Sequence, residues 1–422
     1  MNVLWIINGI REHQYTMLGM DRYSGRASGT WLEAAYCAAQ KQTDIQLHLA
    51  TVYDVPKLMY DTDEGNSFYI LPNRGKCAYD YHDNNNKLDW QIVREIAKPD
   101  VVVVWGTEMP HAYCAMKAMK NIPTVIFVQG IIRTIYDHMF DGWPSAYHCC
   151  TLRDYVDKFS NKSMMNKFKS QLPLEKEMFE MAEGVIVENI WAEYATKAIN
   201  PELRIYYNKL PIKQVFFHND WQIDDIEPFS IFTNAGGYPI KGHHILFKAL
   251  AIVKKRLPNF KCYIPGTRLS VFNSIKRKTG YTQFLNKLID EGNLRDNIIY
   301  VGGLSSEEMV DRIKHCNVYV MPSIVENHSS SLIEAKLIGA PCISSMAGGS
   351  FTLINHEKNG LLYNSLDPEM LAGCIIRVLE NKQYAETLTK NRDGFRMLRR
   401  DNFGNQMNDI YSELLKNKKV IF

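Results

Sequence analysis

Two glutamates near the C-terminal end of the chain carry the most specific chemical pattern. Glu326 lies on an expected loop after the strand 317–321, and Glu334 lies eight residues later in an expected helix over 331–338. An ionised carboxylate only accepts hydrogen bonds, so both side chains suit the hydroxyl groups of a sugar or a ribose. Each also has a plainer interpretation. Glu326 could be a solvated loop carboxylate, and Glu334 could belong to a capping box, Ser331-x-x-Glu334, that needs no ligand.

The beginning of that helix offers an anion site. The first backbone N–H groups of a helix have no partner within it, and the helix dipole adds positive potential at the same end. Both effects favour a diphosphate. We therefore expect a diphosphate to bind around four consecutive residues: Ser329, Ser330, Ser331 and Leu332.

A glycine-rich turn upstream combines a lysine with backbone that a ligand could approach closely. The segment 234–242 reads N-A-G-G-Y-P-I-K-G and follows an expected strand. Glycines such as Gly237 let a ligand approach the backbone closely, and Lys241 brings a positive charge suited to phosphate. The segment lacks the pattern G-x-x-x-x-G-K-[ST], which excludes a P-loop. Gly303 follows another expected strand in the same way, and either turn could equally be an ordinary one without a ligand.

We expect no metal site. Asp61 and Asp63 form an Asp-x-Asp pair that could hold a divalent cation on a sugar diphosphate, but they lie in a polar stretch expected to be a solvated loop. The 9 cysteines show no C-x-x-C spacing, which argues against a structural zinc site. Scattered thiols of this kind are typical of a reducing cytoplasm.

The composition excludes several classes of protein. Of the 422 residues, 46% are hydrophobic and 23% are charged, as in ordinary soluble globular proteins. A formal net charge of +3 is too small for a chain that binds nucleic acid through a basic surface. The N-terminus lacks the basic region of a signal peptide, and no run approaches the roughly 18 apolar residues of a membrane span. We therefore expect a cytoplasmic enzyme with two domains.

Apolar runs alternate with helical patterns in two successive series, which predicts two doubly wound α/β domains. The pattern is interrupted at 217–227, so we expect one domain at 1–218, a second at 219–400 and a terminal helix within 401–422. The expected strands are 3–7, 101–105, 124–128 and 184–187 in the first series, and 229–234, 260–264, 298–301, 317–321, 341–344 and 360–362 in the second.

Together the motifs resemble those of the retaining GT-B glycosyltransferases of family 4. The likeness rests on the E-x7-E pair, on Lys241-Gly242, on Gly348-Gly349 and on the sequence N-G-L-L at 359–362. A weaker likeness to the enzymes of bacterial capsular and exopolysaccharide synthesis runs through the first half, including W-G-T-E-M-P-H at 105–111. The resemblance implies two Rossmann-like domains facing across a cleft. The first would bind an acceptor and the second a nucleotide sugar, with the terminal helix crossing back to the first.

The resemblance also assigns roles to residues of the donor site. Glu326 would face the donor sugar, and Glu334 would bind the nucleotide ribose. Lys241 would hold the diphosphate together with the amides of 329–332, and Gly29 would lie on a loop of the first domain that approaches the donor.

Two positions depart from the common pattern of the family. Many members end a strand with a histidine at the position of Gln129, but the capsular and exopolysaccharide subgroup commonly has glutamine there. The resemblance therefore implies no proton-transferring histidine at this position, and His111 is the nearest alternative polar group for the reacting centre. Many members also have an arginine five residues before the lysine, where this chain has Gly236. Arg268 is one candidate substitute for that charge, and the alternative is that nothing replaces it.

The implied reaction transfers a sugar, with retention, from a nucleotide diphosphate to a hydroxyl of a glycan or lipid-linked acceptor in bacterial surface polysaccharide synthesis. It needs no metal and no cofactor, because the nucleotide sugar is a co-substrate. Two alternatives remain: a non-catalytic nucleotide-sugar-binding or scaffolding subunit of a polysaccharide assembly complex, and a sugar-nucleotide epimerase on the same fold.

A basic segment suggests peripheral contact with the inner face of the membrane. Lysines interleaved with apolar residues attract anionic lipid, although a solvated helical face explains the same pattern. The residues are Lys158, Phe159, Lys162, Met164, Met165, Lys167, Phe168 and Lys169.

Overall fold

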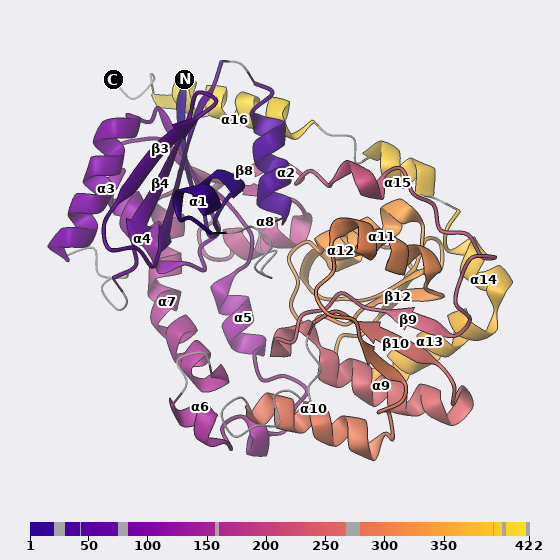
Figure 1. Ribbon diagram of the computed structural model, residues 1–422. Helices are drawn as coiled ribbons and strands as arrows, with labels where there is room; N and C mark the ends of the chain where they lie inside the picture. Colours follow the sequence, from indigo (N-terminus) through magenta and orange to yellow (C-terminus); the bar gives the residue numbers. More distant parts are fainter. Residues whose placement is uncertain are drawn as a thin grey trace. The chain divides into compact units, whose positions relative to one another are not determined.

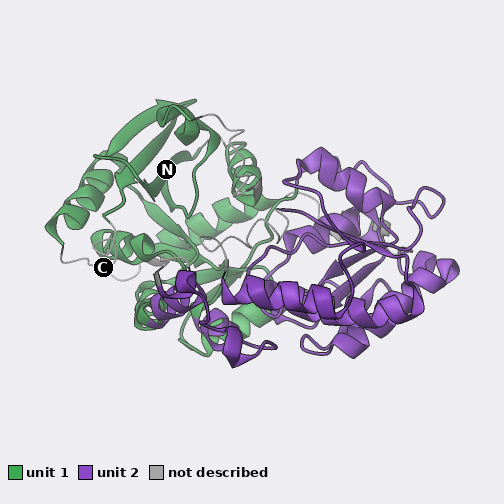
Figure 2. Ribbon diagram, turned by 60° about the horizontal axis from the view of Figure 1, so that its bottom comes forward, with its two compact units in different colours: residues 1–132, 170–212, 401–422 green, residues 133–169, 213–400 purple. Residues whose placement is uncertain are grey.

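The computed structural model describes residues 1–20, 30–42, 44–74, 83–156, 160–266, 279–390, 392–398 and 402–418. The chain forms two compact units (Figure 2). Unit 1 comprises Met1–Ile132, Ser170–Ile212 and Asp401–Phe422, and unit 2 comprises Arg133–Lys169 and Lys213–Arg400. Among the described helices, none combines the length and the apolar character needed to cross a bilayer.

Unit 1 is built on an eight-stranded sheet in the order β3-β4-β2-β1-β5-β6-β7-β8. All neighbouring strands are parallel except the antiparallel pair β3 and β4. The strands are β1 (Asn2–Ile6), β2 (Gln46–Tyr53), β3 (Met59–Asp63), β4 (Asn66–Pro72), β5 (Val101–Trp105), β6 (Thr124–Phe127), β7 (Gly184–Val187) and β8 (Arg204–Tyr207).

Both faces of this sheet are buried, which explains why its central strands are continuous apolar runs. In β5, Val102 and Val104 join one core cluster, whereas Val103 and Trp105 join the other, as the two-residue period of a strand requires. The first cluster includes residues of α3 (Asn84–Ala97), α4 (Pro110–Ala118), α7 (Asn161–Met181) and α8 (Ile190–Lys197). The second includes residues of α2 (Thr30–Ala39) and α16 (Phe403–Lys418).

The terminal helix α16 is part of unit 1 and packs along α2. Its apolar stripe at Met407, Ile410, Tyr411 and Leu414 is buried in the same cluster as Val3 and Trp5. The indole Nε1 of Trp5 donates a hydrogen bond to the Tyr411 hydroxyl at 3.1 Å. Helix α16 therefore covers one face of the sheet that contains β1, the strand formed by the first residues of the chain.

Unit 2 is built on a six-stranded parallel sheet in the order β11-β10-β9-β12-β13-β14. Its strands are β9 (Ser230–Phe232), β10 (Lys261–Ile264), β11 (Ile298–Tyr300), β12 (Val318–Met321), β13 (Cys342–Ser345) and β14 (Leu361–Tyr363). With two parallel sheets, each flanked by helices, the predicted fold class of two doubly wound α/β domains is confirmed.

Helices lie on both faces of the unit 2 sheet (Figure 1). Helices α9 (His243–Arg256) and α13 (Pro368–Glu380) pack against each other on one face, and α11 (Ser306–His315) and α12 (Ser330–Ile338) on the other. The remaining helices outside the sheet cores are α1 (Glu12–Met17), α5 (Ile132–His138), α6 (Leu152–Val156), α10 (Gly280–Glu291), α14 (Lys382–Thr387) and α15 (Arg392–Leu398).

The expected single boundary at 218 does not match the two units, because the segment Arg133–Lys169 groups with unit 2. Its contacts with α10 explain this. The Trp143 ring lies edge-on to Tyr281 at 5.0 Å, and the Asp154 carboxylate accepts a hydrogen bond from the Gly280 N–H at 3.0 Å. These contacts join residues far apart in the sequence, so no local pattern revealed them.

Candidate active site

Lys241, Glu326 and the start of the helix after Glu326 lie where the strand order of unit 2 reverses. From β9 the chain builds β10 and β11 on one side, and it then returns to build β12, β13 and β14 on the other (Figure 1). In doubly wound sheets, ligands bind beyond the carboxyl ends of the strands at this switch point. The loop 233–242 follows β9 and the loop 322–329 follows β12, so the two predicted motifs lie side by side.

Backbone contacts lock the two loops together. The N–H groups of Ile324 and Val325 donate to the carbonyl of Ile240 at 2.7 and 3.3 Å. Gly242 has φ +75°, and a Cβ on it would lie 1.8 Å from the carbonyl oxygen of Pro322. This position therefore needs glycine for its conformation and for its close approach to the neighbouring loop.

Lys241 and Glu326 form an ion pair at the centre of the site. The Lys241 Nζ lies 2.6 Å from Glu326 Oε2, which also accepts a hydrogen bond from the Ser323 hydroxyl at 3.1 Å. The Glu326 carbonyl accepts from the N–H of Gly349 at 3.0 Å, and a Cβ on Gly348 would lie 1.8 Å from that same oxygen. The glutamate backbone is thus fixed, while the lysine side chain remains 32% exposed and reachable by a ligand.

Helix α12 begins beside this ion pair. Its N-cap is Ser329, whose hydroxyl accepts a hydrogen bond from the Leu332 N–H at 3.3 Å and lies 3.2 Å from the Ser331 hydroxyl. The capping-box alternative for Glu334 is wrong, because the helix starts earlier than expected and Leu332 occupies the N3 position that a capping box requires. Glu334 lies further along the helix and has no hydrogen-bond or ion-pair partner within the described residues.

The environment of Glu334 disfavours its charge. Burial raises the pKa of this carboxyl to about 8, against a smaller lowering effect of Lys213. If ribose hydroxyls donate to this carboxylate, they would stabilise its ionised form, and nucleotide binding would then be coupled to loss of the proton.

This coupling predicts a pH dependence of nucleotide affinity. Because the free carboxyl has a pKa raised to about 8, it is mostly protonated at neutral pH and must ionise to accept both ribose hydroxyls. We expect nucleoside diphosphate affinity to rise by about tenfold between neutral pH and pH ~9, as titration calorimetry would measure. The variant Glu334→Gln should bind more weakly and show no such rise. A wild-type affinity independent of pH would contradict a contact between Glu334 and ribose.

The other predicted donor-site residues fall into two groups. A Cβ added at Gly236, Gly237 or Gly303 would meet no atom within 4 Å, so the backbone there is open to a ligand. Gly29 and Arg268 lie outside the described residues.

His111 and Gln129 both belong to unit 1. His111 lies in the first turn of α4, where it is buried, stacks on Trp90 and places Nε2 3.1 Å from the Ile7 carbonyl oxygen. These contacts are those of a core histidine. Gln129 follows β6, and its amide Nε2 is buried without a hydrogen-bond partner in the described chain.

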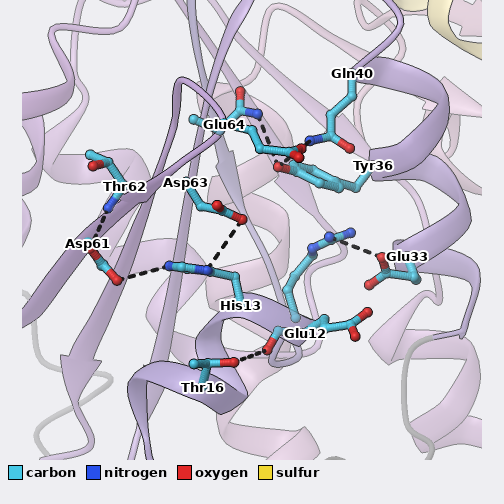
Figure 3. Close-up of polar contacts among 12 residues, drawn as sticks. Glu12, His13, Thr16, Glu33, Tyr36, Gln40, Asp61, Thr62, Asp63 and Glu64 are labelled. Atoms are coloured by element: carbon cyan, nitrogen blue, oxygen red, sulfur yellow. Dashed lines mark hydrogen bonds and ion pairs between the residues drawn. The ribbon is translucent and has the colours of Figure 1, made fainter.

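The Asp-x-Asp pair lies on a strand, not on the expected loop. Asp61 and Asp63 belong to the edge strand β3, and both carboxylates face His13 (Figure 3). Asp61 Oδ2 lies 3.0 Å from Nε2 of His13, and Asp63 Oδ2 lies 3.4 Å from its Nδ1. The described residues contain no group of three or more His, Cys, Asp or Glu side chains that could hold a metal ion.

Sequence reasoning missed one carboxyl at a strand end of unit 1. Burial raises the pKa of Glu108, in the turn after β5, to about 7. Its Oε2 is buried without a hydrogen-bond partner in the described chain. The preceding Gly106 was the available signal, because a glycine directly after a buried strand marks a place where backbone comes close to other groups.

Residues 215–394 match the family model described as "Glycosyl transferases group 1". A UDP-Gal:alpha-D-GlcNAc-diphosphoundecaprenol alpha-1,3-galactosyltransferase of Escherichia coli is 26% identical over 131 residues, which are 30% of this chain and 32% of that protein. Alignments with the first curated relatives cover between 28% and 57% of those proteins, so the chain spans roughly half of their length or less.

Two solved structures show the same fold over nearly the whole chain. The sucrose-phosphate synthase of Thermosynechococcus elongatus has a TM-score of 0.71 at 18% identity and covers 99% of this chain and 100% of its own. Anabaena Alr3699/HepE, in complex with UDP and glucose, has a TM-score of 0.65 at 16% identity and covers 98% of this chain and 99% of its own. The chain is therefore a two-domain protein of the GT-B fold, and its residues 215–394 are similar to the glycosyl transferases group 1 family.

Proposed function

We propose that the protein is a retaining glycosyltransferase of family 4, acting in bacterial surface polysaccharide synthesis. It would transfer a sugar from a nucleotide diphosphate to a hydroxyl of a glycan or lipid-linked acceptor. The observation that carries the proposal is the ion pair of Lys241 and Glu326 at the β9/β12 switch point, beside the N-terminus of α12. The galactosyltransferase and HepE likenesses support a nucleotide-sugar donor, and the former also supports a diphosphate-linked lipid acceptor.

The ion pair exchanges partners when the donor binds. Lys241 turns from Glu326 to the diphosphate, whose other oxygens meet the N–H groups at the start of α12. Glu326, freed from the lysine, then accepts hydroxyls of the donor sugar and stabilises positive charge developing on its ring. Glu334 holds the ribose.

Positive charge placed in advance at the leaving diphosphate lowers the barrier to breaking its bond to the sugar. The acceptor hydroxyl enters on the face from which the diphosphate departs, so the anomeric configuration is retained. An oxygen of the departing phosphate takes the hydroxyl proton. No nucleophile of the protein and no cofactor is needed, because catalysis consists of positioning and electrostatic stabilisation.

The test is a screen of UDP-, GDP- and ADP-sugars with lipid-linked and oligosaccharide acceptors, followed by mass spectrometry of both products. The proposal predicts a free nucleoside diphosphate and an acceptor heavier by one sugar, with the donor configuration at the new bond in NMR spectra. An epimerase would convert the donor without any acceptor. A scaffolding subunit would bind nucleotide and turn nothing over.

The proposed mechanism predicts that chelation leaves turnover intact. Lys241 and the helix N–H groups meet the phosphate charge, so no divalent cation is required. Transfer rates measured with and without EDTA should agree within about twofold, because no contribution to the barrier is lost. Complete loss restored by Mg²⁺ or Mn²⁺ would instead assign a metal to the reaction.

Peripheral membrane contact fits the exposed surface around α6. Leu152 and Tyr155 are 71% and 68% exposed, and the Lys162 Nζ lies 5.1 Å from the centre of the Tyr155 ring. Exposed apolar side chains beside lysines favour an anionic bilayer surface. Of the segment noted in the sequence, Lys158 and Phe159 lie outside the described residues.

At low salt the protein should sediment with vesicles containing phosphatidylglycerol and not with pure phosphatidylcholine. Lys162→Glu should weaken this association, whereas the same change at exposed Lys255 on α9 should not. Failure of the wild type to sediment with anionic vesicles would contradict peripheral membrane contact.

A further inference from the structure

The chain contains one pair of adjacent cysteines, Cys149 and Cys150, which the donor-site motifs do not use. Both are thiols in the structure, and Cys150 is exposed while Cys149 is partly exposed. They lie in the turn between the 3₁₀ helix η2 (Ser145–Tyr147) and α6. An exposed thiol can react with an oxidant, and a second thiol beside it can then close a disulfide.

A buried carboxylate holds the backbone of this turn. Asp154 is buried, and its Oδ2 accepts hydrogen bonds from the N–H groups of Cys150 and Thr151 at 3.1 and 2.9 Å. The Thr151 hydroxyl donates to the same oxygen at 2.8 Å. So does the N–H of Gly280, the first residue of α10, at 3.0 Å. One carboxylate oxygen therefore ties the cysteine turn to the start of α10.

Close packing leaves this turn little freedom to move. A Cβ on Gly280 would lie 1.9 Å from the carbonyl oxygen of Tyr147, so the two backbones approach each other closely. The ring centres of Tyr147 and Phe284 are 5.2 Å apart, and the Cys150 thiol donates to Oε1 of Gln283 at 3.7 Å. A change in the backbone of the turn must therefore disturb its contacts with α10.

A disulfide between adjacent cysteines changes the backbone that carries it. The Cα atoms of disulfide-linked residues are usually about 4.4–6.8 Å apart, whereas adjacent Cα atoms across a trans peptide are about 3.8 Å apart. The ring therefore closes only if the peptide between the two residues distorts. The Cys150 N–H belongs to this peptide, so its hydrogen bond to Asp154 would weaken, and the Cys150 sulfur could no longer donate to Gln283. Strained disulfides are also the more easily reduced, which favours a reversible bond.

We propose that Cys149 and Cys150 form a reversible oxidation site, in which closure of a disulfide loosens the turn before α6 from α10. The oxidant is hydrogen peroxide, which converts the exposed Cys150 thiol to a sulfenic acid and leaves as water. The Cys149 sulfur then attacks the sulfenic acid sulfur, so that the S–S bond forms, the S–O bond breaks and a second water leaves. Two thiols and one peroxide thus give one disulfide and two waters. The site lies within unit 2 and does not depend on sugar transfer.

The test is treatment of the full chain with hydrogen peroxide, followed by mass spectrometry of the peptide that contains both cysteines. We expect this peptide to lose two hydrogen atoms and dithiothreitol to restore them. The melting temperature of the oxidised protein should be about 2–5 °C lower and should recover on reduction, because hydrogen bonds to a carboxylate are lost. Amide hydrogen exchange should become faster in the cysteine turn and in the first turn of α10.

Cys149→Ser and Cys150→Ser nearly keep the shape of each side chain but cannot close the ring, so neither variant should show the reversible change in melting temperature. Cys37→Ser, at an exposed position of α2, is the matched control and should respond as the wild type does. A peptide oxidised without an S–S bond, for example to a sulfinic acid, would overturn the site. A disulfide that forms without faster exchange at α10 would overturn the proposed loosening.

Discussion

Replacing Lys241 with methionine is expected to lower kcat/KM for sugar transfer by about 10²- to 10³-fold, the usual cost of removing one charge-stabilising donor from an active site. Methionine keeps most of the apolar stem but removes the ammonium group that lies 2.6 Å from Glu326 in the free protein. The leaving diphosphate would then lose its point charge, and Glu326 would lose its partner.

Because Lys241 is partly exposed, its loss should leave the fold intact, and the melting temperature should change by no more than a few degrees. Lys255→Met, at an exposed position of α9, is the matched control and should retain full activity. A Lys241→Met enzyme within threefold of wild-type activity would contradict the role of this lysine at the leaving group.

The second large effect is expected from Gly242→Ala. Alanine at φ +75° is strained, and its Cβ would lie 1.8 Å from the Pro322 carbonyl oxygen. The loop after β9 must therefore move away from the loop after β12, which separates Lys241 from Glu326. We expect destabilisation of about 2–5 kcal/mol together with loss of measurable transfer.

Denaturant unfolding and a transfer assay on the same preparation would measure both effects. The control is Gly373→Ala on α13, where a Cβ would meet no atom within 4 Å. That change should stabilise the helix by about 0.5–1 kcal/mol and leave activity unaltered. A Gly242→Ala variant with wild-type stability would show that the close approach of the two loops is not needed.

The sequence predicted the features that depend on local patterns. Buried parallel strands read as apolar runs, and strands of unit 2 such as β12 (Val318–Met321) lie within a residue of their expected positions. Lys241 and Glu326 were predicted from motifs, and the topology explains why motifs 85 residues apart meet: both follow strands that flank one switch point.

Features that depend on tertiary contacts were missed. The choice between Ser329 and Ser331 as N-cap is not resolved by residue type, since both hydroxyls can cap a helix, and the structure selects the earlier one. The polar stretch at Asp61 forms a strand because its backbone pairs antiparallel with β4. Glu108 lies in the segment W-G-T-E-M-P-H at 105–111, but that pattern does not reveal its burial, which depends on tertiary packing.

The most direct test of the proposed glycosyl transfer compares wild-type protein with Glu326→Gln. Transfer from a nucleotide-sugar donor is followed by mass spectrometry of donor and acceptor in parallel. The amide keeps hydrogen bonding but removes the charge that is expected to act on the donor sugar. We predict an acceptor heavier by one sugar with the wild type, and about a hundredfold slower transfer with Glu326→Gln at unchanged nucleoside diphosphate affinity. Equal transfer by the two proteins would contradict it.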